Sequence, residues 1–267
     1  MKLLNEILGT KYPIIQGGMA NIATGEFAAA CSNAGALGII GAGGMNADTL
    51  RQNIRRCREL TDKPFGVNIM LMHPQADEFA QIVVEEKVAV VTTGAGNPGK
   101  YMAAWKNAGI KIMPVVASVA LAKRMERAGA DAVIAEGMEG GGHIGELTTM
   151  PLVPQVVDAL SIPVIAAGGI ADGRGMAASF MLGAEGVQCG TIFLATPECC
   201  ISDKYKELVL KATDISTVVT GRPSGHPCRS IKTPLQRRCL ELEETVTDKS
   251  LEEIEEATAG SLRKAVQ

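Results

Sequence analysis

Two stretches decide the fold of this chain, Pro163–Ile170 (PVIAAGGI) and Gly186–Thr191 (GVQCGT). Each begins with a short, largely apolar run without strict alternation, which is typical of a strand buried on both faces of a parallel sheet. Each run ends on glycine, and a helical pattern over 173–182 separates the two. This repeat predicts βα units, which form either a closed barrel or an open, doubly wound sheet.

The same pattern recurs throughout the chain before residue 190. Eight strands are predicted, over 12–16, 37–40, 65–69, 88–92, 111–115, 132–135, 163–167 and 186–189. Helices are predicted between them, over 24–33, 46–60, 75–86, 99–108, 118–128, 151–160 and 173–182. Eight is the full complement of a (β/α)₈ TIM barrel, an α/β fold that takes about 250 residues in one domain. We therefore expect such a barrel over 1–198.

The pattern changes after residue 198, and 199–267 are expected to form a small subdomain appended to, or inserted in, the last barrel unit. A helix is predicted over 199–212, followed by an irregular stretch over 213–238. Residues 222–238 hold five cationic side chains and no acid, whereas 241–256 hold eight acids and one lysine on a predicted exposed helix. The basic segment is either a solvated face or a surface that attracts an anionic partner.

Composition argues against several classes of function. The net charge is −3 and only 3% of residues are aromatic, which disfavours nucleic acid and anionic membranes as partners. The seven cysteines form no CxxC pair and have no metal-ligand spacing, so reduced thiols and no metal site are expected. The N-terminus is too polar for a signal peptide, and no apolar run approaches the roughly 18 residues of a membrane span. A cytoplasmic protein is expected.

The glycines at the ends of the last two strands predict a phosphate site. Gly168 and Gly169 end the seventh strand, while Gly190 and Thr191 follow the eighth. Barrel enzymes commonly bind phosphate at this place, where glycine lets backbone N–H groups approach the anion and a helix N-terminus adds attraction. The alternative is that these glycines only form tight turns. Their coincidence at the two correct strand ends favours phosphate.

Another glycine motif, GAGNPG at 94–99, matches the GxGxxG pattern of dinucleotide-binding folds and follows a predicted strand. No acid lies about 20 residues further on, where such folds contact the ribose. The preceding strand is also the fourth of the eight barrel strands. We interpret this motif as a turn into a helix.

A glycine-rich loop with a histidine, EGMEGGGHIG at 136–145, follows the sixth strand. Its glycines allow it to lie against a flat ligand while His143 faces the end of the barrel where such enzymes keep their chemistry. Imidazole titrates near neutral pH and can donate a proton or polarise a carbonyl. His143 is therefore the candidate catalytic residue. For His73 and His226, which lie in polar loops next to proline, structural or exposed positions are favoured.

Two other strand ends carry residues suited to a planar ring. After the first strand, Gly18 permits close backbone approach and Met19 offers a polarisable apolar contact. In the third strand, Asn68 interrupts an apolar run. A buried amide needs hydrogen-bond partners, which either the edge of a heterocycle or the protein backbone supplies. Both interpretations of Asn68 are open at this point.

Together these motifs resemble the flavin-dependent enoyl-acyl carrier protein reductase II family, which is related to the nitronate monooxygenases. The matching segments span nearly the whole chain in order: PIIQGGMA (13–20), FGVNIML (65–71), AEGMEGGGHIGELTTMPLVPQV (135–156), PVIAAGGIADGRG (163–175), GVQCGTIFLAT (186–196) and SGHPCRSIK (224–232). The glycine–histidine and AAGGI segments are shared with the nitronate-oxidising enzymes. GVNIML and GHPCRSIK are more similar to the reductases.

The resemblance implies that FMN mediates the transfer of hydride from NADH or NADPH to a trans-2-enoyl thioester on acyl carrier protein, a step of fatty acid biosynthesis. It implies that His143 polarises the thioester carbonyl or delivers the α-proton. It also implies a set of cofactor contacts: Gly18, Met19, Asn68, Glu136 and Gly142 around the flavin, with Gly168, Gly169, Gly190 and Thr191 at its phosphate. Arg229 and Lys232 would then meet the acidic carrier protein.

A homodimer is expected, and dependence on a monovalent cation is left open. Related chains usually continue beyond the position of Gln267 into a glycine-containing loop and a helix that help close the flavin site, so a longer natural chain is one interpretation of where this sequence stops.

Two alternatives to the reductase remain. One is nitronate oxidation by flavin and O₂, with His143 at the nitronate, and the other is a non-catalytic barrel that binds a phosphorylated ligand.

Overall fold

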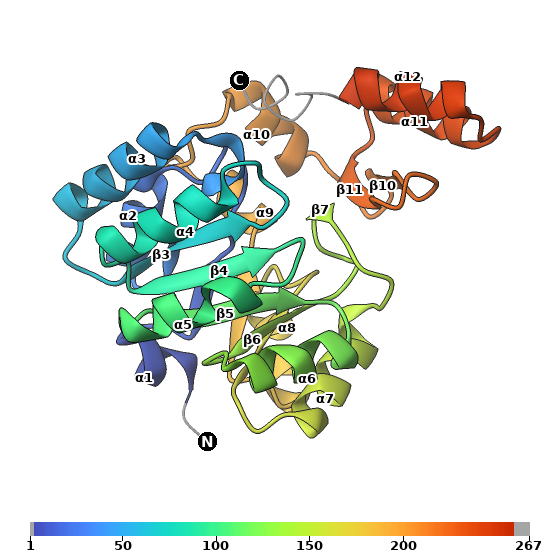
Figure 1. The fold of residues 1–267 in the computed structure, drawn as a ribbon. Helices are drawn as coiled ribbons and strands as arrows, with labels where there is room; N and C mark the ends of the chain where they lie inside the picture. Colours follow the sequence, from blue (N-terminus) through green and yellow to red (C-terminus); the bar gives the residue numbers. More distant parts are fainter. Residues whose placement is uncertain (1–2, 259–267) are drawn as a thin grey trace.

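The barrel is formed by eight parallel strands in the order β1-β9-β8-β6-β5-β4-β3-β2. The computed structural model describes residues 3–258, whose arrangement is shown in Figure 1. The strands are β1 (Ile14–Gln16), β2 (Gly38–Gly41), β3 (Phe65–Met70), β4 (Val90–Gly94), β5 (Lys111–Val116), β6 (Val133–Glu136), β8 (Val164–Ala167) and β9 (Gly186–Cys189). The eight predicted strands are confirmed, each within two residues at either end.

Hydrogen bonds between β1 and the start of β2 close the barrel. Leu37 N donates to Ile14 O at 2.8 Å, and Gln16 N donates to Leu37 O at 2.9 Å. The fully buried side chain of Gln16 continues this link, because its Oε1 accepts from Ile39 N at 3.0 Å. The first and last strands of the sheet therefore meet, as the TIM-barrel prediction requires.

Two apolar clusters cover the two faces of the sheet. One consists of strand residues such as Ile15, Val90 and Ile165 together with Leu4, and it fills the barrel interior. The other lies between the strands and the surrounding helices and includes Val91 and Trp105. Burial of both faces explains why the strands show apolar runs rather than alternation.

The helices alternate with the strands around the barrel (Figure 1). They are α2 (Gly25–Ala34), α3 (Ala47–Leu60), α4 (Ala76–Glu85), α5 (Gly99–Asn107), α6 (Val119–Ala128), α7 (Thr149–Ala159) and α8 (Gly173–Met181). Several begin at a side-chain cap of the type that favours helix starts, such as Asn46 before α3 and Asp172 before α8. The short α1 (Leu4–Leu8) precedes the first strand. Its Leu4 N donates to the backbone oxygen of Glu185, the residue before β9, at 2.9 Å.

The GAGNPG motif is a turn between β4 and α5, as predicted. β4 ends at Gly94, and α5 begins at Gly99. Between them Ala95 and Gly96 have positive φ angles of 53° and 151°. Asn97 Oδ1 accepts from Gly99 N at 3.0 Å and so supports the start of the helix.

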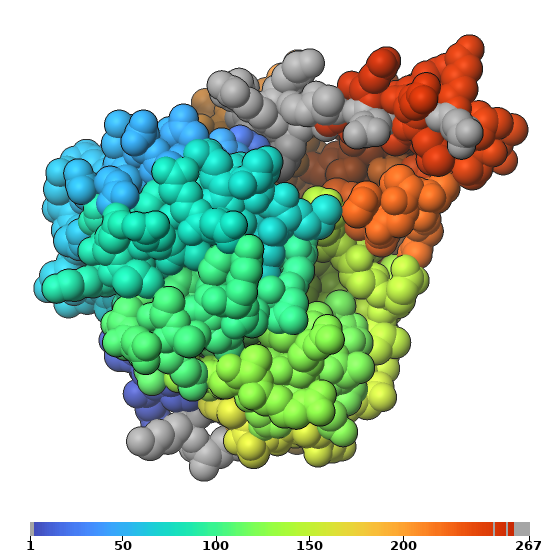
Figure 2. All heavy atoms as spheres, in the orientation of Figure 1, coloured from blue at the N-terminus to red at the C-terminus, as the bar shows by residue number. Residues whose placement is uncertain are grey.

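After β9 the chain forms α9 (Thr191–Leu194), α10 (Asp203–Leu210), the hairpin strands β10 (Thr217–Thr220) and β11 (Cys228–Ile231), and the helices α11 (Pro234–Glu243) and α12 (Asp248–Thr258). The hairpin joins the two-residue strand β7 (Gly142–His143) in a second sheet of order β10-β11-β7. In Figures 1 and 2 the hairpin β10–β11, drawn in orange, lies beside the loop that carries β7, and the helices α11 and α12, drawn in orange-red, lie beyond it.

Three predictions for this part were wrong in detail. The helix predicted over 199–212 begins only at Asp203, because a turn in which Cys199 N donates to Thr196 O precedes it. The stretch 213–238 is not irregular: it contains β10, β11 and the start of α11, since pairing between its own strands and with β7 satisfies the backbone. The acidic stretch 241–256 is divided between two helices, which bury Cys239 and Ile254.

Within residues 3–258, no helix is long and apolar enough to cross a membrane. In the same part of the chain, no group of three or more His, Cys, Asp or Glu side chains is arranged to hold a metal ion.

Candidate active site

The C-terminal ends of β1, β3 and β9 come together at one end of the barrel. A Cβ added to Gly18 would lie 2.3 Å from Asn68 Cβ, so the backbone after β1 is in direct contact with Asn68 and only glycine fits. A Cβ added to Gly190 would lie 3.7 Å from Met19 Sδ. The structure therefore brings together four of the residues that the sequence predicted around a flavin, from three separate strand ends.

Asn68 uses part of its hydrogen-bonding capacity within the protein. Its Nδ2 donates to Oγ1 of the buried Thr92 at 2.9 Å. Within residues 3–258, its Oδ1 accepts no hydrogen bond. Thus one end of the amide is held by the neighbouring strand β4, and the other end is available to a ligand at the barrel opening.

The loop after β8 has a backbone conformation that favours glycine at two consecutive positions. Gly168 and Gly169 have φ angles of +98° and +73°. A Cβ at Gly168 would lie 2.8 Å from Gly137 O and 2.9 Å from Thr149 Oγ1. Glycine is thus required by both conformation and space, and the backbone of this loop is packed against the loop after β6.

Thr149, the first residue of α7, links these two loops. Its Oγ1 lies 2.8 Å from Glu139 Oε2 and 2.9 Å from Gly168 O, and its single proton serves one acceptor at a time. Its backbone N donates to Glu139 Oε2 at 2.9 Å. The sequence carries no local signal for this support, because Glu139 lies ten residues before Thr149 in the chain.

Gly190 and Thr191 follow β9, which pairs with β8 through Ala167 and Gln188. The turn they form is therefore adjacent to Gly168 and Gly169, as the phosphate prediction needs. Thr191 begins α9, and the first N–H groups of a helix have no acceptor within the helix. The backbone N–H groups that follow β8 and those that follow β9 therefore lie next to each other at the same end of the barrel.

Glu136, the last residue of β6, has a strongly altered acidity. Burial raises the pKa of its carboxyl to about 7. Within residues 3–258 its carboxyl makes no hydrogen bond or ion pair, and Gly140 lies over it, since a Cβ there would be 2.8 Å from Glu136 Oε1. A half-buried carboxyl without a partner among the described residues is a candidate contact for a polar ligand group.

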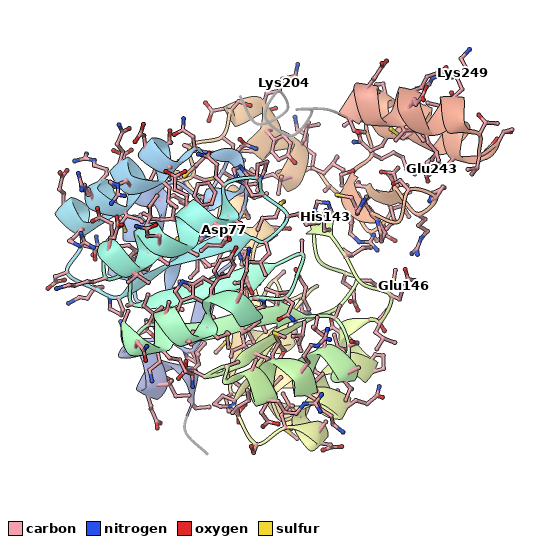
Figure 3. The ribbon with its side chains drawn as sticks, viewed as in Figure 1. Asp77, His143, Glu146, Lys204, Glu243 and Lys249 are labelled. Carbon is pink, nitrogen blue, oxygen red and sulfur yellow. The ribbon has the colours of Figure 1, made fainter. Side chains whose placement is uncertain are left out.

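His143 lies on the small sheet rather than on the barrel. Its strand β7 pairs antiparallel with β11, with His143 opposite Cys228 and Gly142 opposite Arg229. The imidazole is exposed, and Figure 3 shows it between the barrel and the C-terminal part. The sequence predicted a loop at this position, whereas the partner strand that holds it comes from a segment that was expected to be irregular.

The other histidines and the two candidate carrier contacts differ in their surroundings. His73 Nδ1 accepts from Gln75 N at 3.1 Å and its ring stacks on Phe79 at 4.7 Å, which agrees with a structural role. His226 is exposed. Arg229 Nε donates to the backbone oxygen of Met138 at 3.0 Å, whereas Lys232 is exposed and its side chain makes no hydrogen bond or ion pair with the described residues.

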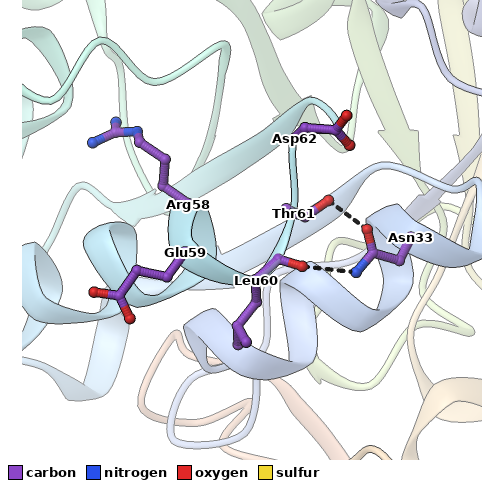
Figure 4. Close-up of a pocket in the computed structure, with 6 residues that line it drawn as sticks. All are labelled: Asn33, Arg58, Glu59, Leu60, Thr61 and Asp62. Carbon is purple, nitrogen blue, oxygen red and sulfur yellow. Dashed lines mark hydrogen bonds between the residues drawn. The ribbon is translucent and has the colours of Figure 1, made fainter.

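A hollow of about 520 Å³ elsewhere on the molecule is not part of this site (Figure 4). It is lined by Asn33 and by residues 58–62, at the ends of α2 and α3. Asn33 Nδ2 donates to Leu60 O at 3.0 Å, and Thr61 Oγ1 donates to Asn33 Oδ1 at 2.6 Å. These residues precede strands, so the hollow lies at the barrel end opposite the glycine loops, where TIM barrels rarely keep catalytic groups.

Comparison with known proteins identifies the family. The family that matches is one of flavin-dependent oxidoreductases. A model of the nitronate monooxygenase family matches residues 1–267, and the chain belongs to this family.

Three relatives illustrate the range of the family. A solved structure of FabK from Thermotoga maritima is 54% identical with a TM-score of 0.96, over 100% of this chain and 85% of that one. A probable nitronate monooxygenase of Staphylococcus saprophyticus is 38% identical, over 93% of this chain and 84% of its own length. The (3aS,4S,5R,7aS)-5-hydroxy-7a-methyl-1-oxo-octahydro-1H-indene-4-carboxyl-CoA dehydrogenase of Mycobacterium tuberculosis is 40% identical over 87% of this chain. The match spans 66% of that dehydrogenase, less than two thirds of its length.

Proposed function

We propose that this chain is an NAD(P)H-dependent, FMN-mediated reductase of trans-2-enoyl thioesters carried by acyl carrier protein. The observation that carries the proposal is the pairing of His143 with Cys228. Cys228 belongs to SGHPCRSIK (224–232), a segment that is more similar to the enoyl reductases than to the nitronate-oxidising enzymes. This segment therefore lies directly beside the candidate catalytic histidine. The 54% identity to FabK, an enoyl-acyl carrier protein reductase, supports the same choice.

The polar groups at the barrel opening fit FMN as the flavin. Gly168 and Gly169 would present backbone N–H groups to its phosphate, with Gly190 and Thr191 on the adjacent strand end. Asn68 Oδ1 and the carboxyl of Glu136, both without a protein partner among the described residues, would contact polar edges of the cofactor. Gly18 permits close approach of the ring, and Met19 supplies an apolar contact.

The residues of this chain would orient the substrate and manage its proton. A bound flavin supplies the hydride that reaches the β-carbon of the enoyl thioester. The imidazole of His143 would donate a hydrogen bond to the thioester carbonyl oxygen or deliver the proton that the α-carbon gains. Because His143 is carried by a loop of three glycines, its imidazole can approach a substrate that lies over the barrel opening.

A thioester substrate is also consistent with the printed name of the relative from Mycobacterium tuberculosis, which acts on a carboxyl-CoA compound. Coenzyme A and acyl carrier protein present the same reacting group, an acyl thioester. In this proposal the acidic carrier protein would approach the basic segment 222–238, whose exposed Lys232 is available to it.

Anaerobic mixing tests the proposal. The FMN-loaded protein is reduced with NADH or NADPH while absorbance near 450 nm is followed, and crotonyl thioester on acyl carrier protein is then added. We expect rapid bleaching by the nicotinamide and recovery of absorbance with the thioester but not with a nitroalkane. No recovery with the thioester would contradict the reductase proposal.

Nitronate oxidation is the second candidate, because the family model and the Staphylococcus saprophyticus relative both carry that name. It predicts consumption of O₂ with an alkyl nitronate in the absence of nicotinamide. A non-catalytic barrel for a phosphorylated ligand predicts a colourless protein that takes up no FMN. The visible spectrum after incubation with FMN therefore separates this last candidate from both enzymes.

A further inference from the structure

Arg229 contacts the loop that carries His143 at both ends of that loop. Its backbone pairs with Gly142, one residue before the histidine. Its Nε donates to Met138 O at 3.0 Å, at the beginning of the same loop. Its Nη1 donates to Thr217 Oγ1 at 3.0 Å, in strand β10. One half-buried side chain therefore connects the loop to the hairpin of the C-terminal part.

Other contacts hold only the start of this loop in the described structure: Met138 N donates to Leu147 O at 2.8 Å, and Thr149 N donates to Glu139 Oε2 at 2.9 Å. Residues 140–142 are all glycine, which loses more backbone entropy on ordering than any other residue. A Cβ added to Gly141 or Gly142 would meet nothing within 4 Å, so these residues are not packed against the barrel. Within residues 3–258 the imidazole of His143 has no hydrogen-bond partner. The position of His143 therefore depends on the contacts with β11.

A second arginine, Arg222, also contacts the segment after β7, but through an exposed ion pair, which is weaker than the hydrogen bonds of Arg229. Arg222 Nη1 lies 3.1 Å from Glu146 Oε1, and both side chains are exposed. Water and salt screen an exposed ion pair, so it adds little to loop order. Arg229 is half-buried and donates two hydrogen bonds to oxygen atoms in different segments. Charge-assisted hydrogen bonds of this kind are the stronger ones.

We propose that Arg229 is a positioning residue that holds residues 138–142 and so sets the place of the His143 imidazole. This inference rests on the proposed function only for the role of His143 in catalysis. It separates Arg229 from Lys232, because the guanidinium of Arg229 is engaged within the protein, whereas the exposed ammonium of Lys232 makes no hydrogen bond or ion pair with the described residues and can meet a partner. Arg229 thus acts through the loop rather than by touching the carrier protein.

Hydrogen exchange of the FMN-loaded protein tests the inference directly. In Arg229→Gln, backbone amides of residues 139–143 are expected to exchange roughly ten- to a hundredfold faster, as expected for loss of hydrogen bonds from a charged donor. Arg229→Lys keeps the charge but not the forked geometry, and should follow Arg229→Gln rather than the wild type. Arg222→Gln and Lys232→Gln are the matched controls, and both should exchange as the wild type does.

Kinetics provide the second measurement. Both Arg229 variants should lower kcat by the same factor for crotonyl thioester on coenzyme A and on acyl carrier protein, with little change in the ratio of the two KM values. Lys232→Gln should instead raise KM for the carrier-linked substrate alone. If Arg229→Lys behaves as the wild type and Arg229→Gln affects only the KM for carrier-linked substrate, Arg229 is a docking cation and the inference is wrong.

A milder variant covers the case in which Arg229→Gln does not fold. Thr217→Val removes one acceptor of Arg229 and leaves the bond to Met138 O, so exchange at 139–143 should rise by an intermediate amount. Unchanged exchange in both Thr217→Val and Arg229→Lys would overturn the inference. Failure of the proposed function is visible separately, as absence of enoyl reduction by the wild type, and leaves the exchange measurement interpretable.

Discussion

His143 and Cys228 face each other directly across strands β7 and β11. Ile144 N donates to Pro227 O at 3.0 Å, which makes His143 and Cys228 a non-hydrogen-bonded pair of the antiparallel ladder. In such pairs the side chains are closer than in hydrogen-bonded pairs. The thiol of Cys228 is therefore the lateral neighbour of the candidate catalytic imidazole.

Replacement of His143 by alanine should separate catalysis from cofactor binding. We expect FMN to stay bound, because the predicted contacts to the cofactor come mainly from the barrel strand ends. Turnover should fall roughly 10²–10⁴-fold, the usual contribution of a general acid. Fluorescence quenching of FMN and steady-state reduction of crotonyl thioester measure the two effects. His226→Ala, an exposed histidine of the C-terminal part, is the control, and equal turnover in His143→Ala and wild type would remove His143 from the mechanism.

The size of residue 228 should affect His143. Cys228→Phe places a large ring beside the imidazole and is expected to displace it, with a loss of roughly ten- to a hundredfold in kcat. Cys228→Val is similar in size to the native residue and should retain most of the activity. FMN content and Tm are measured on both variants to separate displacement from unfolding. Full activity in Cys228→Phe would show that the imidazole adjusts freely.

Substitution of Gly168 should damage the phosphate loop. In Gly168→Ala the methyl group would lie 2.8 Å from Gly137 O, and the backbone has a positive φ of 98°. Strain of this kind costs about 1–3 kcal/mol, so both Tm and FMN affinity should fall. Gly173→Ala is the matched control, because a Cβ there meets nothing within 4 Å. Equal FMN affinities in the two variants would argue against a phosphate at Gly168.

The stability of the apoprotein should depend on pH through Glu136. Burial raises the pKa of this carboxyl to about 7, so the folded state binds its proton more tightly than the unfolded state does. The associated stabilisation is complete below the unfolded value near 4.5 and is lost as pH rises through 7. Glu136→Gln should therefore raise the free energy of unfolding of the apoprotein more at pH 8.5 than at pH 5, and the difference between the two effects should be at most about 3 kcal/mol. Urea unfolding at the two pH values measures this, and a pH-independent effect of the substitution would contradict it.

The barrel itself was predictable from local patterns. Short apolar runs that end on glycine, such as those before Gly168 and Gly190, indicate strands buried on both faces, and their number indicates a closed barrel. The strand ends of a parallel barrel all lie at one end, so residues as distant as Gly18, Asn68 and Gly190 could be assigned to one site before any coordinates. Their contacts at the barrel opening agree with that assignment.

The C-terminal part was not predictable in the same way. Strands β10 and β11 are four residues each and carry no strong alternation, so their pairing depends on partners far away in the sequence. One of those partners is β7, whose two residues give no strand signal at all. The double role of Arg229, paired with Gly142 and bonded to Met138, exists only once the hairpin lies against the glycine loop.

The sequence by itself thus determined the barrel, its glycine-lined opening and the presence of a histidine loop, because burial patterns and backbone conformations at strand ends are local properties. Only the tertiary structure decided what holds that histidine: a hairpin from the far end of the chain, with Cys228 beside it and Arg229 across the loop. The reason is physical, since three successive glycines specify no conformation of their own and take their order from the strand with which they pair.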